Sequence, residues 1–335
     1  MHERQLNTIH NRSVKSLKKF TQITMMLLLV IAIITGCSTG NETAKKNENG
    51  AQTQKSDFPV KIKDASGKEI TIDEKPGKIV SLIPSNTEIL FALGLEKEVV
   101  GVSDFDNYPE AAAKKTKIGG MEFNVEKIVG LKPDLVLAHE SGMATAKDGL
   151  KQLEDAGITV FVVNDATNFK DTYNSIDTIA EVTGTESKGD KIVKSMKDDL
   201  EDIQEKAETV KEKKKVWVEI SPSPEIYTAG KGTFIDEMLQ AINAENAAGN
   251  LDGWAKVSEE QPVAYNPDVV VTTYGFYTEK PKEQVMARQA WKDVTAVKNN
   301  HIYDVHSDKV TRPGPRLIEG VEELAQAIYP EVFKK

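Results

Sequence analysis

Residues 126–136 read EKIVGLKPDLV, and residues 260–270 read EQPVAYNPDVV. Each segment places an acidic residue, Glu126 or Glu260, seven positions before a Pro-Asp pair, and a β-branched run follows that pair. The two copies lie more than a hundred residues apart, which is too far for a solenoid period. The repeat therefore predicts two similar lobes, each with an acidic helix that leads into a strand.

Strand signals alternate with helical segments around both copies. Runs such as DLVLA (134–138) and ITVFVV (158–163) are apolar on both faces, which is typical of a parallel sheet covered by helices. The pattern predicts an α/β protein with two Rossmann-like lobes and mostly parallel sheets. The expected strands are 60–62, 69–72, 79–82, 99–102, 135–138 and 159–163 in the first lobe, and 216–220, 269–273 and 302–305 in the second.

One long amphipathic helix is predicted between the lobes, over residues 186–213. Its apolar residues recur at three- and four-residue steps among Lys, Glu, Asp and Gln: Ile192, Val193, Met196, Leu200, Ile203, Ala207 and Val210. Such a helix would run on the order of 40 Å and join a first lobe at 58–185 to a second at 214–335. A single stiff connector permits only small hinge motions. The alternative is a peripheral helix within one domain.

Residues 1–36 have the pattern of an export signal. A positive region precedes the apolar run 23–34, which is too short to span a bilayer. The sequence Ile34-Thr35-Gly36-Cys37 resembles the lipobox of bacterial lipoproteins, in which the cysteine is linked to a diacylglycerol and becomes the first mature residue. Cys37 is the only cysteine of the chain, so it has no disulfide partner. We predict a lipid anchor at Cys37; the alternative is an inert buried cysteine.

Composition limits the remaining possibilities. Residues 38–57 contain no aromatic or branched apolar residue, which predicts a disordered tether after the anchor. The rest is long enough for two domains of ordinary size. The net charge of -9 opposes nucleic-acid binding, which favours a basic surface.

Enzyme motifs are missing from the sequence. It contains no G-x-S-x-G, G-x-G-x-x-G, H-E-x-x-H or C-x-x-C pattern and no Walker lysine loop. Outside the signal the histidines are His139, His301 and His306, which are widely spaced. We therefore predict no catalysis and no metal site, although three distant histidines could converge in the fold. A surface hydrolase or an adhesive lipoprotein remains a remote alternative.

Five segments of the chain resemble the periplasmic vitamin B12-binding protein family. They are IVSLIPSNTE (79–88), GVSDFDNYP (101–109), NVEKIVGLKPD (124–134), WAKVSEE (254–260) and SDKVTRPGPR (307–316). The broader group includes the ferric siderophore and haem binders of ABC importers. The resemblance implies the class III binding-protein fold, with two lobes on one long helix.

The same resemblance implies a function. It predicts a monomeric substrate-binding lipoprotein on the outer face of the cytoplasmic membrane, which captures cobalamin or a related corrinoid and catalyses nothing. Its partners would be an ABC permease dimer and the cytoplasmic ATPase, and it would need no cofactor. The alternative ligand is a ferric siderophore or haem, because Arg312 and Arg316 would suit anionic oxygens.

The family pattern also suggests which residues contact the ligand. Phe105 stands where the family has a ligand-packing tyrosine, and Trp254 matches a tryptophan of the second lobe; either ring could instead be core packing. A bulky planar ligand needs such apolar walls and a few polar groups. The predicted contacts are Ser85, Asn86, Phe105, His139, Trp254, Asp308, Lys309, Val310, Thr311, Arg312 and Arg316.

The aromatic walls are thinner here than in the family. Gly120, His139 and Ile220 replace aromatic positions of the cobalamin binders. Three aromatic residues after a strand of the second lobe would restore part of the wall: Tyr274, Phe276 and Tyr277. His139 is either a hydrogen-bonded wall residue or an axial ligand to a metal.

Glu126 and Glu260 match the two lobe-top glutamates that dock into arginine pockets of the permease. One acid on each lobe suits a partner of roughly two-fold symmetry. The alternative is that both acids only stabilise helix starts, because Asn124 and Ser258 are candidate N-caps just before them.

Overall fold

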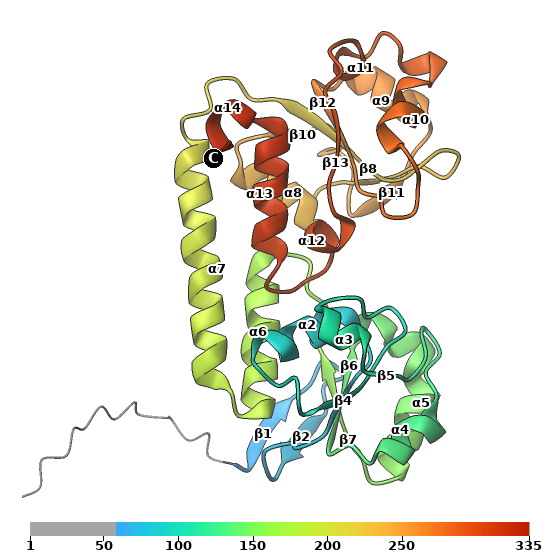
Figure 1. The fold of residues 1–335 in the computed structure, drawn as a ribbon, viewed down its shortest axis with the longest axis vertical. Coiled ribbons are helices and arrows are strands. Elements are labelled where there is room, and N and C mark those ends of the chain that lie inside the picture. Colours follow the sequence, from blue (N-terminus) through green and yellow to red (C-terminus); the bar gives the residue numbers. More distant parts are fainter. Residues whose placement is uncertain (1–57, 335) are drawn as a thin grey trace, which may run out of the picture. The chain divides into compact units, whose positions relative to one another are not determined.

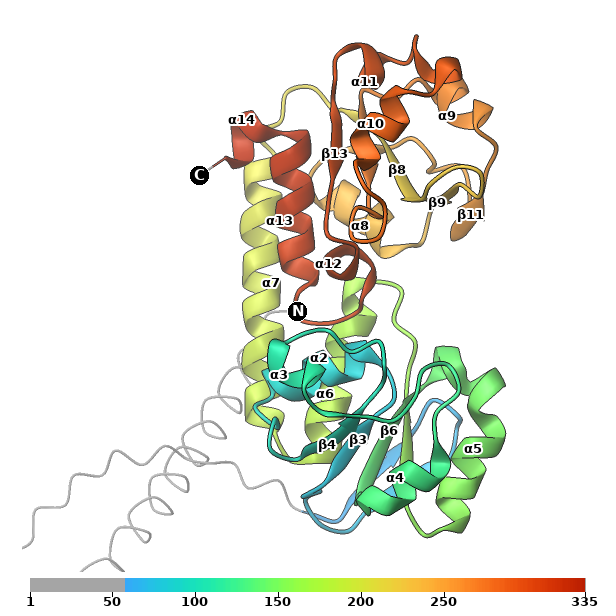
Figure 2. The same ribbon diagram turned by 45° about the vertical axis from the view of Figure 1, so that its right-hand side comes forward.

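The computed structural model describes residues 58–334, which belong to one compact unit. Figures 1 and 2 show two α/β lobes connected by one long helix, as the sequence predicts. The predicted signal peptide, Cys37 and the tether lie outside the described residues.

The first lobe opens with a hairpin. Strands β1 (Val60–Lys63) and β2 (Glu69–Ile72) pair antiparallel. The Oδ1 atom of Asp64 accepts a hydrogen bond from the Ser66 amide at 2.9 Å, and Gly67 has a φ of 84°. Only glycine adopts this left-handed conformation without strain, so these residues form the turn.

Five parallel strands form the sheet of the first lobe, in the order β5-β4-β3-β6-β7. They are β3 (Ile79–Ser81), β4 (Val99–Val102), β5 (Thr116–Lys117), β6 (Leu135–His139) and β7 (Thr159–Val163). Every residue of β6 is buried, because helices cover both faces of the sheet. These helices are α2 (Pro84–Ala92), α3 (Glu110–Ala113), α4 (Val125–Leu131), η2 (Glu140–Gly142), α5 (Met143–Asp155) and α6 (Phe169–Thr183).

The sheet of the second lobe is mixed. Strands β8, β10, β12 and β13 are parallel, whereas β9 pairs antiparallel with β8 and β11 pairs antiparallel with β9. Their bounds are β8 (Lys215–Ser221), β9 (Tyr227–Ala229), β10 (Glu245–Asn246), β11 (Trp254–Lys256), β12 (Val269–Thr272) and β13 (Ile302–Asp304). The helices are α8 (Phe234–Ala241), α9 (Glu260–Tyr265), α10 (Pro281–Met286), η3 (Gln289–Trp291), α11 (Thr295–Lys298), α12 (Ser307–Thr311), α13 (Leu317–Ile328) and α14 (Pro330–Phe333).

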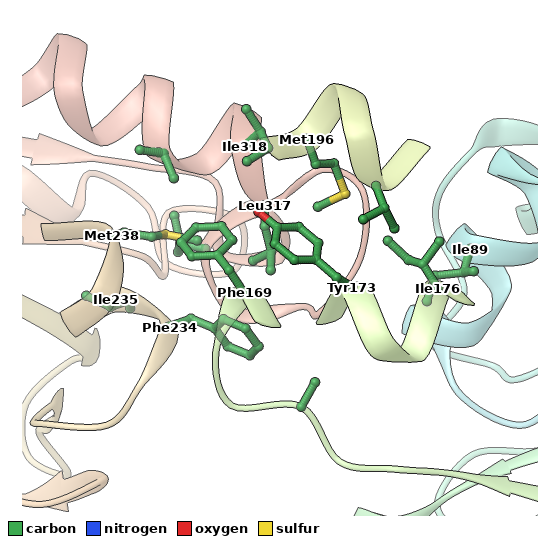
Figure 3. Packing of buried hydrophobic residues seen from close by; sticks show 14 of the residues in the cluster. Ile89, Phe169, Tyr173, Ile176, Met196, Phe234, Ile235, Met238, Leu317 and Ile318 are labelled. Atoms are coloured by element: carbon green, nitrogen blue, oxygen red, sulfur yellow. The ribbon is translucent and has the colours of Figure 1, made fainter. Parts of the chain in front are cut away.

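Helix α7 (Glu186–Ala207) contacts both lobes. It packs against α6 of the first lobe and against α8, α13 and α14 of the second. Figure 3 shows how apolar side chains from these helices meet, with Tyr173 of α6 near Met196 of α7 and Leu317 of α13. One continuous hydrophobic cluster therefore crosses between the lobes and resists their separation.

The Pro-Asp repeat has the same structural role in both lobes. Lys132 is the C-cap of helix α4 and Asn266 that of α9, and each has the left-handed conformation, with φ of 53° and 45°. Proline follows because it cannot continue a helix, and the aspartate then begins the approach to a central strand, β6 or β12.

Several predicted strands differ from the structure by one residue at an end, and two larger differences concern the long helix and the short strands. The long helix ends at Ala207, before the predicted end at 213, because the chain tightens into turn hydrogen bonds from Thr209 and Val210. The following residues, 211–214, are all charged and offer no apolar side chain to bury. The short strands β5, β9, β10 and β11 were not predicted, since none of them contains the Val or Ile residues that mark the other strands.

Candidate functional site

A cavity of about 270 Å³ lies between the lobes. The first lobe contributes Ile83, Ser85, His139, Ser141, Asp165, Ala166 and Thr167 to its lining, and the second contributes Gly232, Thr233, Phe234, Gly253, Trp254, Thr311 and Pro313. The lining is therefore rich in hydroxyl groups. We call this space the interlobe cavity.

A second cavity of about 150 Å³ adjoins the first within the first lobe. It shares Ile83, His139 and Ser141 with the interlobe cavity, and most of its other lining is apolar. A Cβ atom added at Gly120 would lie 3.1 Å from Cζ of the Phe105 ring. The missing side chain at position 120 thus leaves room for this apolar cavity.

His139 lies at the end of β6 and lines both cavities. Its Nδ1 accepts a hydrogen bond from the Ser141 amide at 3.3 Å and lies 2.8 Å from Ser141 Oγ. Because an amide can only donate, Nδ1 is the acceptor and the neutral ring carries its proton on Nε2. Burial lowers the pKa of His139 below 6.5, although Asp165 and Glu140 act in the opposite direction. The ring is thus a neutral hydrogen-bond donor.

Ser85 and Asn86 lie in the first turn of helix α2, but they face different surroundings. Ser85 lines the interlobe cavity, is 3% exposed, and its Oγ is without a hydrogen-bond partner in the part of the chain that the structure describes. Asn86 is 1% exposed, and its amide donates to the Ala138 carbonyl at 3.0 Å. In the described structure Asn86 ties α2 to β6 and does not line either cavity.

Two predicted aromatic contacts are partly exposed beside the cavities. Phe105 lines the apolar cavity and Trp254 the interlobe cavity, with 54% and 48% of their surfaces exposed. Phe276 and Tyr277 are also exposed, but they do not line either cavity. Tyr274 is fully buried, and its hydroxyl donates a hydrogen bond to Glu219 at 2.7 Å. Its ring therefore does not line the cleft.

Arg312 and Arg316 are paired across the lobes with Glu88 of α2. Nη1 of Arg312 lies 2.6 Å from Glu88 Oε1, whereas Nε and Nη2 of Arg316 lie 2.8 and 2.6 Å from its two oxygens. Arg316 also lies 3.9 Å above the Tyr108 ring. Glu88 thus balances one of the two positive charges. Neither arginine lines the two cavities described above, whereas Arg316 lines a separate one together with Glu88 and Tyr108.

The other residues of the 308–311 stretch separate into distinct roles. Asp308 accepts from the amide of Asn107 in the first lobe at 2.9 Å. Lys309 pairs with Glu319 and Glu323 of its own lobe. Val310 is fully buried in the shared core, and only Thr311 lines the interlobe cavity.

Glu126 and Glu260 lie on the surface in the first turns of α4 and α9. Asn124 is the predicted N-cap of α4, and its Oδ1 accepts from the Lys127 amide at 2.8 Å. For α9, the Ser258 amide donates to the Gln261 side chain at 3.1 Å, which is half of the expected capping box. A hydrogen bond from Ser258 also lowers the pKa of Glu260. Both acids are therefore accessible on the surface.

Two further observations concern the described residues alone. Across residues 58–334, no three His, Cys, Asp or Glu side chains gather closely enough to hold a metal ion. No helix in this same part of the chain has the length and apolar character needed to cross a bilayer.

Several residues of the site escaped the sequence prediction. Thr233 and Ser141 line the interlobe cavity, and Glu88 holds the two arginines. Glu88 stands inside the family-like segment 79–88, but no spacing rule links it to residues more than two hundred positions away. Only the meeting of the lobes gives it a partner.

Two α/β lobes on a single long helix, with a cavity between them, define a two-lobed binding protein of class III. The chain belongs to the periplasmic binding protein family, whose model matches residues 79–309. Members of this family are the binding components of transporters and are not enzymes. The predicted resemblance, fold class and absence of enzymatic function are thus confirmed.

Three relatives define the group more closely. The chain is 51% identical to an uncharacterized ABC transporter substrate-binding lipoprotein, YvrC, of Bacillus subtilis, over 95% of this chain and 100% of the relative. It is 32% identical to a cobalamin-binding protein of Halobacterium salinarum, over 81% of this chain and 74% of the relative. A possible iron-binding, periplasmic solute-binding protein of Staphylococcus epidermidis has a solved structure with a TM-score of 0.70 and 39% identity, over 76% of this chain and 100% of that one. This chain is accordingly a substrate-binding protein of an ABC transporter, which implies a permease and an ATPase as its partners.

Proposed function

We propose that this protein is a lipid-anchored, extracytoplasmic binding protein that captures a corrinoid between its lobes and delivers it to an ABC permease. The observation that carries the choice of ligand is the charge of the cleft. Among the described residues that line the two cavities there is no lysine or arginine, because Arg312 and Arg316 are engaged by Glu88.

Ligand chemistry explains why this matters. A catecholate siderophore is polyanionic, and haem carries propionate carboxylates, so both gain from free guanidinium or ammonium groups. The peripheral amides of a corrinoid are uncharged and need hydroxyl and other neutral hydrogen-bonding groups. Ser85, Thr233 and Thr311 in the lining fit the second requirement.

His139 supports the same ligand. With Nδ1 accepting from Ser141, Nε2 carries the proton and can donate to an amide or phosphate oxygen. A metal ligand would need an unprotonated Nε2, hence the other tautomer. The identity of 32% with a cobalamin-binding protein agrees with this choice.

The alternative ligand is haem or a ferric siderophore. It is favoured by the 39% identity with a possible iron-binding protein. If the Ser141 hydroxyl accepted from Nδ1, His139 Nε2 would be free to ligate iron. The two ligand classes can therefore be separated by direct binding.

Docking and anchoring complete the proposal. Glu126 and Glu260 would contact the permease, which their exposure on equivalent helices of the two lobes supports. Figures 1 and 2 place α4 and α9 on the side of the lobes away from α7. Cys37 would carry the lipid, and the mature chain would act as a monomer.

The test is a calorimetric titration of residues 38–335 with cyanocobalamin, hemin and a panel of ferric siderophores. Tryptophan quenching gives a second readout, because Trp254 is half exposed beside the cavity while Trp217 and Trp291 are fully buried. We expect submicromolar cyanocobalamin binding, with most of the quenching lost in Trp254→Phe. Tight siderophore binding without corrinoid binding would refute the proposal.

A further inference from the structure

Glu88 has an unusual position for a buried carboxylate. It belongs to α2 of the first lobe, yet its partners Arg312 and Arg316 belong to the second. The Glu88 side chain is 3% exposed, and those of Arg312 and Arg316 are 13% and 9% exposed. Charge-assisted hydrogen bonds of this kind are strong when they are shielded from water.

A second contact crosses the lobes beside the first. Asn107 accepts from Arg312 Nη1 at 2.9 Å and donates to Asp308 at 2.9 Å. Asp308 in turn lies 2.9 Å from Arg312 Nη2. The carboxylates of Glu88 and Asp308 thus balance the charges of the two guanidinium groups.

This network borders the interlobe cavity. Thr311 and Pro313, the neighbours of Arg312 in the chain, both line that cavity. If Glu88 lost its charge, one carboxylate would remain for two guanidinium groups, and the excess positive charge would lie next to the cleft. A buried, unpaired cation is costly, so an anionic ligand would gain affinity by compensating it.

We propose that Glu88 is a specificity-determining residue, which holds Arg312 and Arg316 across the lobes and so keeps positive charge out of the cleft. The protein then discriminates against anionic tetrapyrroles and ferric chelates in favour of uncharged ligands. Glu88 also positions the lobes, because it is a direct polar link between α2 and the segment that follows α12. The choice of favoured ligand rests on the function proposed above, whereas the effect on anionic ligands does not.

The test compares Glu88→Gln with Glu323→Gln in residues 38–335. Glu323 pairs with Lys309 inside the second lobe, so its variant removes a paired carboxylate without touching the lobe-to-lobe contact. Hemin and cyanocobalamin are the probes, measured by calorimetry. We expect Glu88→Gln to bind hemin at least about tenfold more tightly than the Glu323→Gln control, with no comparable gain for cyanocobalamin. Equal hemin affinity in the two variants would overturn the proposal.

A triple variant separates charge from a loss of folding. Glu88→Gln with Arg312→Gln and Arg316→Gln has no unpaired cation, and the Asp308 carboxylate keeps its hydrogen bond from Asn107, so the variant should fold and lose the gained hemin affinity. If the gain persists without the arginines, they are not its source and the assignment is wrong. If no variant binds cyanocobalamin, the proposed function is contradicted. The comparison of hemin affinities would still test the role of Glu88.

The positioning role has its own readout, which needs no ligand. The segment from residue 38 contains no cysteine, so spin labels can be placed at Lys147→Cys in the first lobe and Lys292→Cys in the second, both on the surface. We expect a broader distance distribution in Glu88→Gln than in Glu323→Gln. Identical distributions would show that Glu88 does not hold the lobes.

Discussion

Asp134 of the first lobe and Asp268 of the second occupy equivalent positions. Oδ2 of Asp134 accepts from the amides of Gly77 and Lys78 at 2.9 and 2.8 Å, just before β3. Oδ2 of Asp268 accepts from the amide of Lys215 at 2.9 Å, at the start of β8. Asp134 precedes β6 and fixes the beginning of β3, which pairs with β6. Asp268 precedes β12 and fixes the beginning of β8, which pairs with β12.

Replacing either aspartate should destabilise the fold. Asp134→Ala and Asp268→Ala each leave strand amides without their charged acceptor, and we expect each to lower the free energy of unfolding by about 1–3 kcal/mol. Urea unfolding followed by circular dichroism measures the effect. Asp198→Ala, which removes an exposed ion pair on α7, should cost under about 1 kcal/mol. Losses no larger than in this control would contradict the assigned role.

Two neighbouring glycines should respond differently to the same change. Gly119 has a φ of 112°, and a Cβ there would lie 2.6 Å from the Glu122 carbonyl oxygen. Gly119→Ala should therefore cost about 1–3 kcal/mol in unfolding. In Gly120→Ala the new Cβ meets only the half-exposed Phe105 ring, so stability should change by less than about 0.5 kcal/mol.

Ligand affinity should respond in the opposite order, with the larger loss in Gly120→Ala and the smaller in Gly119→Ala. Gly120→Ala narrows the apolar cavity beside Phe105, and we expect cyanocobalamin affinity to fall by roughly threefold to tenfold, about 1 kcal/mol. Calorimetry on both variants checks this. Unchanged affinity in Gly120→Ala would exclude the apolar cavity from the binding site.

His139 should make stability depend on pH in one direction. Its folded pKa lies below the ordinary 6.5, so the unfolded chain binds a proton that the folded chain does not. The contribution is complete above pH 6.5 and is lost as the pH falls from 6.5 towards the folded pKa. His139→Asn keeps an acceptor for the Ser141 amide but cannot titrate. The unfolding free energy of the native chain should therefore fall relative to this variant at acidic pH, and parallel curves would contradict the prediction.

Charge reversal of the two lobe acids should abolish uptake without affecting ligand binding. Glu126→Arg with Glu260→Arg places cations where the permease is expected to offer arginines, and neither residue lines the two cavities. Transport into cells and calorimetry of the purified variant are the two measurements. Glu69→Arg with Glu331→Arg makes the same charge change at other exposed positions. If uptake persists in the Glu126→Arg and Glu260→Arg double variant, these acids only stabilise the starts of their helices.

Much of the fold could be predicted from the sequence because its signals are local. Apolar runs gave the long central strands, and strands β2, β4 and β7 have the predicted bounds. The short strands β9 and β11 were missed because pairing of β9 with β8 and of β11 with β9, and not their own composition, makes them strands. The helix end at Ala207 was likewise set by turn hydrogen bonds.

The site was less accessible to prediction. The family resemblance predicted ligand contacts that include Ser85, His139, Trp254 and Thr311. In the structure these four residues line the interlobe cavity. It placed Val310 and Lys309 among the contacts as well, although one is core and the other is paired within its lobe. Adjacent residues on a short helix point in different directions, so a matching stretch does not define which of its side chains face the cleft.

The sequence by itself determined the two-lobed α/β architecture and the repeated Pro-Asp segment, because hydrophobic period and turn chemistry act between near neighbours in the chain. Only the tertiary structure decided the charge of the cleft. Glu88 and Arg316 are 228 positions apart, and their contact at 2.6 Å exists because α2 and the segment before α13 meet where the lobes join. Electrostatic pairing depends on distance in space, which no local pattern encodes.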